Sequence, residues 1–181
     1  MRVITGFLGG RIFESPHGHR THPMSEKMRG AIFSALGDIK GLEVLDCFSG
    51  SGALAIEAIS RGAKTSTAIE VDKKAHSIIE KNLKTLGLED RISVVRAYVN
   101  AWSTRHQNQT FDIVLVDPPY NDIPYRDLNK IPVHLKKDGI LVLSWPKGVD
   151  YYYFEGLQMI RQKSYGDSTL FFYKLAQKTK V

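Results

Sequence analysis

The sequence has a single cysteine and no long apolar run. Cys47 is the one cysteine among 181 residues, which excludes an internal disulfide and a zinc cluster built on cysteine. No apolar stretch approaches the roughly 20 residues needed to cross a bilayer. Residues 1–8 lack the basic-then-apolar order of a signal peptide. These absences predict a cytoplasmic protein with no membrane association.

The basic residues are unevenly distributed. The net charge is +6, yet residues 41–144 contain thirteen basic and thirteen acidic residues, so the excess lies in the two flanks. A neutral middle with basic ends suits a small-molecule site framed by surfaces that meet a polyanion. Ordinary solubilising charge explains the same pattern, because +6 is modest for this length.

The order of apolar segments predicts an α/β fold. From residue 42 onward, β-type runs alternate with segments of helical periodicity, which is typical of a mostly parallel sheet with helices on both faces. Two final β segments separated by Gly166-Asp167 predict an antiparallel C-terminal hairpin. We expect strands at 42–45, 65–69, 92–96, 111–116, 139–144, 157–165 and 168–175, and helices at 53–61 and 73–86.

The first 40 residues follow a different pattern. Residues 3–7 and 11–13 flank Gly9-Gly10 and predict a small β-hairpin, and residues 15–23 predict a polar loop. Ser25 is placed to cap a helix over residues 26–36. We therefore divide the chain into an extension of hairpin, loop and helix, residues 1–40, and a main α/β domain, residues 41–181.

Ligands in such sheets bind beyond the carboxyl ends of the strands. The first strand of the main domain runs into a glycine loop, Asp46-Cys47-Phe48-Ser49-Gly50-Ser51-Gly52, which lets a ligand approach the backbone. The second strand runs into Glu70, which is placed to accept both hydroxyls of a ribose. The glycine spacing alone fits either NAD or S-adenosylmethionine.

Asp46 separates these two cofactors. A carboxylate beside the loop would repel the pyrophosphate of NAD. S-adenosylmethionine has no phosphate and carries a sulfonium and an ammonium, both of which a carboxylate attracts. Asp46 therefore favours S-adenosylmethionine.

The fourth strand ends in Asp117-Pro118-Pro119-Tyr120, which predicts the chemistry. An exocyclic base amine is a poor nucleophile, because its lone pair is delocalised into the ring. Asp117 and the Pro118 carbonyl are placed to accept its two N–H groups and to stabilise the charge that develops on nitrogen. The two prolines stiffen the loop, and Tyr120 is suited to stack on a flipped-out base.

These motifs carry a family resemblance. Asp46-x-Phe48-x-Gly50-x-Gly52 with Asp117-Pro118-Pro119-Tyr120 resembles the methyltransferases that act on base amino groups. Residues 1–4, 9–11, 22–33, 60–63 and 165–167 make the chain similar to the bacterial RsmD family. The resemblance implies a Rossmann-like class I methyltransferase fold and a small N-terminal hairpin and helix extension. It also implies methylation of the 2-amino group of a guanine in small-subunit (16S) ribosomal RNA.

The resemblance assigns roles to individual residues. Asp117, Pro118 and Tyr120 are the expected catalytic residues, and no metal is expected. Arg96-Ala97-Tyr98 replaces the family's usual acidic end of the third strand, so backbone near Ala97 and the ring of Tyr98 are expected to meet the adenine. The expected cofactor residues are Asp46, Phe48, Ser49, Gly50, Gly52, Glu70, Val71, Ala97, Tyr98 and Asp117, and the expected RNA contacts are Arg11, Arg20, His22 and Arg29.

The predicted partner is ribosomal RNA, either in the small subunit or in an assembly intermediate, and a monomer suffices. Three alternatives remain: a DNA adenine or cytosine amino-methyltransferase, an NAD-linked oxidoreductase and a non-catalytic RNA-binding module. The chain has no segment free for a DNA target-recognition region. The oxidoreductase leaves residues 117–120 without a role, and binding alone needs neither motif.

Overall fold

The computed structural model describes residues 1–16 and 24–177, which contain a seven-stranded sheet of order β3-β2-β1-β4-β5-β7-β6. The first five strands of this order are parallel, and β7 and β6 join antiparallel at one edge. The predicted α/β class with a mostly parallel sheet and an antiparallel C-terminal hairpin is confirmed. The strands are β1 (Glu43–Asp46), β2 (Thr65–Ile69), β3 (Ile92–Val95), β4 (Phe111–Val116), β5 (Leu135–Pro146), β6 (Leu157–Tyr165) and β7 (Ser168–Leu175).

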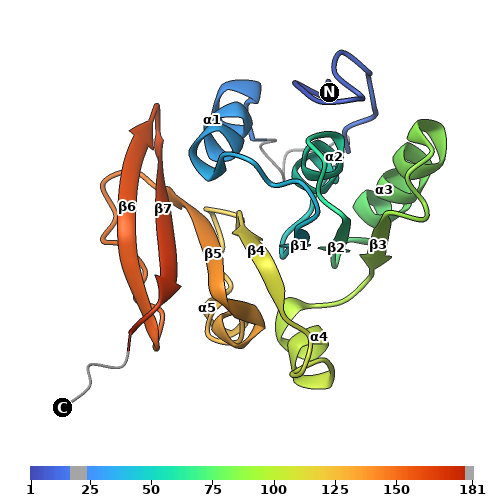
Figure 1. Cartoon of the computed structure of the whole chain (residues 1–181). Helices are drawn as coiled ribbons and strands as arrows, with labels where there is room; N and C mark the ends of the chain where they lie inside the picture. The colour runs from blue at the N-terminus through green and yellow to red at the C-terminus, as the bar shows by residue number, and fades with distance from the viewer. Residues whose placement is uncertain (17–23, 178–181) are drawn as a thin grey trace.

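Helices cover both faces of the sheet. In Figure 1, α1, α2 and α3 lie on one side of the strands and α4 and α5 on the other, as crossover connections in a parallel sheet require. None of the helices in the described ranges is long and apolar enough to cross a membrane. The helices are α1 (Glu26–Leu36), α2 (Ala53–Ser60), α3 (Lys73–Leu86), α4 (Val99–Arg105) and α5 (Tyr125–Leu128), with a 3₁₀ turn at Pro132–His134.

Local signals account for the helix boundaries that the sequence predicts. The Ser25 hydroxyl accepts from the Met28 amide at the start of α1, and the Asp72 carboxylate accepts from Ala75 at the start of α3. Gly87 ends α3 at φ 67°, a left-handed conformation that glycine adopts without strain. The sequence did not predict α4, α5 or the 3₁₀ turn, because these short elements have no full apolar period.

The N-terminal segment is a closed loop with little regular strand. Arg2 and Ile12 form a single antiparallel bridge, and the Phe13 amide donates to the Met1 carbonyl at 3.0 Å. The Phe7 amide instead donates to the Ser60 carbonyl of α2. Within the loop, the Gly10 amide also donates to the Val3 carbonyl and the Arg11 amide to the Leu8 carbonyl, each at 2.9 Å. The predicted hairpin therefore forms as a closed loop with one bridge in place of two regular strands.

A buried carboxylate on α2 holds this loop against α1 and α2. Glu57 is fully buried and accepts from the amides of Ile4 at 2.8 Å and Thr5 at 3.1 Å. It also accepts from Arg61 Nε at 2.7 Å and lies 3.7 Å from Arg29 Nε on α1. One side chain thus links the N-terminal loop, α1 and α2.

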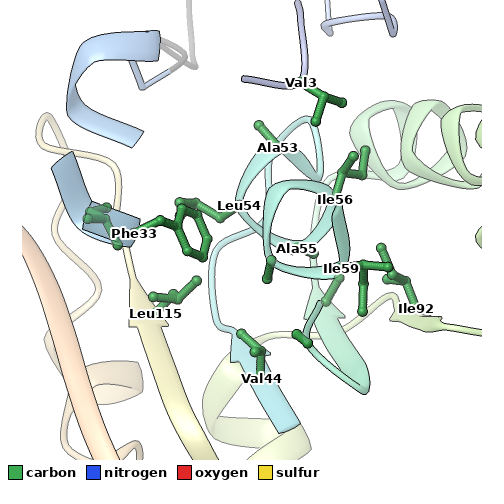
Figure 2. Packing of buried hydrophobic residues seen from close by; sticks show 14 of the residues in the cluster. Val3, Phe33, Val44, Ala53, Leu54, Ala55, Ile56, Ile59, Ile92 and Leu115 are labelled. Carbon is green, nitrogen blue, oxygen red and sulfur yellow. The ribbon is translucent and has the colours of Figure 1, made fainter. Parts of the chain in front are cut away.

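Residues from both predicted parts share one hydrophobic core. Figure 2 shows Val3 and Phe33 packed around α2 together with Val44 of β1 and Leu115 of β4. These side chains are at most 1% exposed. The division at residue 40 therefore stays a prediction about function, since packing joins the two parts into one core.

We expect Glu57→Gln to destabilise the protein by about 3 kcal/mol, because it leaves the buried Arg29 guanidinium without its counter-charge. The NH₂ group of the glutamine would also face the backbone amide of Ile4 or Thr5, and two donors cannot form a hydrogen bond. Urea unfolding followed by circular dichroism measures the change. Glu26→Gln is the matched control: it removes an exposed ion pair with Arg2 and should leave the unfolding midpoint unchanged. Equal midpoints for wild type and Glu57→Gln would show that this contact does not hold the loop.

Candidate active site

The predicted site residues converge at the carboxyl edge of the parallel strands. Asp46 ends β1, which lies between β2 and β4, and its register partners are Ala68 and Leu115. Glu70 follows β2 directly, and Asp117 follows β4 directly. Adjacent parallel strands therefore deliver three carboxylates to one edge, as the sequence predicted.

Asp46 is fully buried without a partner. Its exposed fraction is 0%, and neither carboxylate oxygen has a hydrogen-bond partner among the described residues. The pKa of Asp46 is raised to about 7, mainly by burial and to a smaller extent by the charges of Asp117 and Glu70, while the nearby Ser49 hydroxyl and Ala55 backbone oppose the rise. A buried carboxyl without partners is costly, and a polar or cationic ligand would offset that cost.

The glycine loop is shaped both for a ligand and for packing. Gly50 has φ 53°, and a Cβ atom there would meet nothing within 4 Å. Gly52 has φ 78°, and a Cβ atom there would lie 3.1 Å from Ile79 of α3. Gly50 thus leaves open space beside the loop, whereas Gly52 lets α3 approach. The loop is also tied down by the buried Ser49, whose hydroxyl donates to the Asp46 carbonyl at 3.1 Å.

Glu70 organises the edge of this space. Its two oxygens accept from the amides of Gly50 and Asp72, each at 2.7 Å. Burial raises its pKa, and these backbone hydrogen bonds oppose the shift. Each carboxylate oxygen keeps a free lone pair, so Glu70 is able to accept ligand hydroxyls as well.

The loop after β4 is held by a neighbouring strand. Tyr120 Oη and Ser144 Oγ are 2.5 Å apart, and Ser144 is buried in β5. Burial raises the pKa of Asp117 to about 6, and the Ser144 hydroxyl opposes this shift. Pro118 is buried and Pro119 exposed. The sequence did not predict Ser144, because no motif marks it and only strand pairing brings it here.

The remaining expected cofactor residues lie around the same edge. Phe48 and Ala97 are partly buried and pack against the apolar side chains on the α4 and α5 side of the sheet, such as Trp102. Val71 is 44% exposed and Tyr98 is 64% exposed, so both present apolar surface at the rim. Their assignment to a cofactor stays a prediction.

The four expected RNA contacts have different outcomes. Arg11 is exposed in the N-terminal loop. Arg20 and His22 lie outside the described residues. The expectation for Arg29 is wrong: its side chain is 0% exposed, pairs with Glu57 and donates to the Arg2 carbonyl at 2.6 Å. Sequence periodicity placed Arg29 on a helix but did not show that the N-terminal loop covers it.

Within residues 1–16 and 24–177, no group of three or more histidine, cysteine, aspartate or glutamate side chains is arranged to hold a metal ion.

Comparisons with known proteins agree on one family. A family model described as "Conserved hypothetical protein 95" matches residues 1–174. The chain is 37% identical over 120 residues to "Ribosomal RNA small subunit methyltransferase D" of Buchnera aphidicola, a match covering 66% of this chain and 62% of the relative's length. It is 33% identical over 181 residues to "Putative rRNA methyltransferase YlbH" of Bacillus subtilis, covering 96% of this chain and 98% of that one.

A solved structure shares the whole architecture. "Putative methyltransferase yhhF from Escherichia coli" superposes with a TM-score of 0.85 at 27% identity and covers 97% of each chain. The predicted Rossmann-like class I methyltransferase fold is confirmed.

We expect Asp46→Asn to change how stability depends on pH. An exposed aspartate in the unfolded chain titrates near pH ~4, whereas folded Asp46 titrates at about 7. Between these values the folded state binds more protons, so wild-type stability falls as pH rises from about 4 to 7. Asparagine does not ionise, so the stability of the Asp46→Asn variant should not fall in this way.

Urea unfolding of both proteins across this pH range measures the difference. The stability of the variant relative to wild type should rise with pH and level off above about 7. Parallel stability curves would show that Asp46 is not a buried titrating group.

Proposed function

The chain belongs to the family described as Conserved hypothetical protein 95, and we propose that it transfers a methyl group from S-adenosylmethionine to the 2-amino group of a guanine in small-subunit ribosomal RNA. Its family membership confirms the resemblance to the RsmD family that the motifs predicted. The observation that carries the proposal is the convergence of Asp46, Glu70 and Asp117-Pro118-Pro119-Tyr120 at one sheet edge. We further propose that it acts as a monomer in the cytoplasm.

The residues at this edge fit S-adenosylmethionine. When bound, this cofactor supplies an activated methyl group on a positively charged sulfur. Asp46, whose oxygens have no partner among the described residues, would attract the cofactor's positive charges. Glu70 would accept the ribose hydroxyls, and the open space at Gly50 would admit the cofactor against the backbone. Tyr98, exposed at the rim, would pack on the adenine.

The residues after β4 would hold the base. Asp117 would accept one N–H of the amino group, and the Pro118 carbonyl would accept the other. This keeps the nitrogen lone pair directed at the methyl group and stabilises the positive charge that develops on nitrogen. Tyr120 would stack on the base, with its hydroxyl fixed by Ser144. The nitrogen would then lose a proton, which the Asp117 carboxylate would accept.

The alternatives explain less of the site. A non-catalytic RNA-binding module has no use for a buried carboxylate beside a glycine loop. An amino-methyltransferase acting on DNA would use the same loop. Relatives named for ribosomal RNA favour the RNA substrate.

We expect Asp117→Asn to lower methyl transfer at least 100-fold, because it removes a charge that acts in the transition state. Tritium transfer from labelled S-adenosylmethionine to small ribosomal subunits lacking the modification measures the rate. Label recovered as 2-methylguanosine identifies the product. Cofactor affinity, measured by calorimetry, should change less than the rate does. Label found in duplex DNA and not in RNA would move the protein to the DNA-modifying class.

We expect Glu70→Ala to weaken S-adenosylmethionine binding about tenfold or more, because it removes a charged acceptor for the ribose hydroxyls. Calorimetric titration measures the dissociation constant, and circular dichroism checks folding. Glu80→Ala is the matched control, since Glu80 is an exposed acid on α3. Unchanged affinity in Glu70→Ala would remove Glu70 from the cofactor site.

A further inference from the structure

A polar groove lies between α4 and α5, outside the site described above. It is a shallow, open depression of about 560 Å³, lined by Asn100, Ala101, Thr104, Arg126, Asn129 and Lys130. Arg126 and Lys130 supply its charge, and none of these six residues is acidic. Neither cation forms an ion pair with a described residue, so both keep their charge for a ligand.

The groove has a fixed shape. Asp127 of α5 is 7% exposed, and its carboxylate accepts from the Asn100 amide at 2.6 Å, which joins α5 to the start of α4. Asp127, the acidic residue next to Arg126 in the chain, is thus buried and hydrogen-bonded to a backbone amide instead of forming an ion pair with Arg126. The groove therefore presents two positive charges that form no ion pair with a described residue, on two helices joined by this hydrogen bond.

An exposed aromatic ring stands at one end of α5, beside the groove. Tyr125 is 54% exposed, and its ring centroid lies 5.9 Å from that of Tyr152. Tyr152 packs in turn on Trp145 at 5.6 Å and donates from its hydroxyl to the groove residue Asn129 at 2.6 Å. Tyr125 is thus supported from within and offers its remaining surface to solvent.

The groove lies close to the base-binding loop along the chain. Tyr125 is five residues beyond Tyr120, and α4 begins directly after Tyr98. Both helices start where the chain leaves the carboxyl edge of the sheet. A strand of RNA whose target base occupies the loop after β4 would pass over this region.

We propose that this groove binds single-stranded RNA flanking the target guanine, with a base stacked on Tyr125 and backbone phosphates held by Arg126 and Lys130. The proposal rests on the proposed RNA substrate and adds a second contact surface to it. Cations together with a supported aromatic ring match the backbone and base of an unpaired strand. A lipid surface or an apolar protein partner would instead require a wider apolar patch.

Fluorescence anisotropy of the full chain with a labelled single-stranded RNA oligonucleotide tests the groove. We expect Arg126→Gln and Lys130→Gln each to weaken binding and to reduce the slope of log affinity against log salt by about 1. Tyr125→Ala should weaken binding about 5- to 100-fold, and Tyr125→Phe should retain it, because stacking needs the ring and not the hydroxyl. The phenylalanine variant also shows whether any loss comes from misfolding.

Lys137→Gln is the matched control for charge. Lys137 is exposed and lines a separate groove with Leu36 and Gly139. This groove lies at the amino-terminal end of β5, opposite the strand ends that form the site. Its substitution should leave RNA affinity at the wild-type value. Equal losses in Lys137→Gln and Arg126→Gln would overturn the proposal, because binding would then follow total charge. Wild-type affinity and salt slope in all three groove variants would also overturn it.

Methyl transfer separates this proposal from the proposed function. With small-subunit RNA as substrate, Arg126→Gln should raise KM several-fold and leave kcat within about twofold, because the contact forms equally in the ground and transition states. If wild type transfers no methyl group to RNA, the proposed function fails, while the anisotropy series still judges the groove. If wild type is active and KM is unchanged in the groove variants, the groove proposal alone fails.

Discussion

The buried carboxylate of Glu57 is the contact on which the N-terminal part of this protein depends. It accepts hydrogen bonds from two backbone amides of the N-terminal loop and from Arg61 at the end of α2, and it forms an ion pair with Arg29 of α1 at 3.7 Å. A carboxylate buried in this way is stable only when its partners are all in place. The loop closes over Arg29, and Gly6 lies so near α2 that a Cβ atom there would be 1.8 Å from the Ser60 carbonyl oxygen. Together these contacts hold the first residues against α1 and α2.

The opposite situation holds at the carboxyl edge of the sheet. There Asp46 is buried as deeply as Glu57, yet no described residue bonds to its carboxylate. Asp117 and Glu70 lie near enough to raise its pKa further. A protein tolerates such a cluster where a ligand completes it, and a cofactor with two positive charges suits it. Glu57 thus serves the fold, because its partners belong to the protein, whereas Asp46 suits a ligand, because none of the described residues bonds to its carboxylate.

Motifs at strand ends were predictable because they are local. Asp117-Pro118-Pro119-Tyr120 directly follows the mostly apolar strand β4, and the glycine loop directly follows the apolar strand β1. The same local pattern therefore predicts both the end of a strand and the site residues beside it. Ser144 could not be found in this way. It is an ordinary serine in β5, and it meets Tyr120 only because β5 pairs with β4. The α4–α5 groove was missed for a similar reason, since helices of seven and four residues leave no periodic pattern.

The sequence by itself determined the α/β class, the places of the seven strands and of the helices α1, α2 and α3, and the residues at each strand end, because apolar period and turn chemistry act over short distances. Only the tertiary structure decided which charges are free. Arg29 and Arg126 look alike in the sequence, yet Arg29 is enclosed against Glu57 and Arg126 opens onto a groove. The physical reason is that burial depends on which segment covers a side chain, and that segment is set by contacts between residues far apart in the chain.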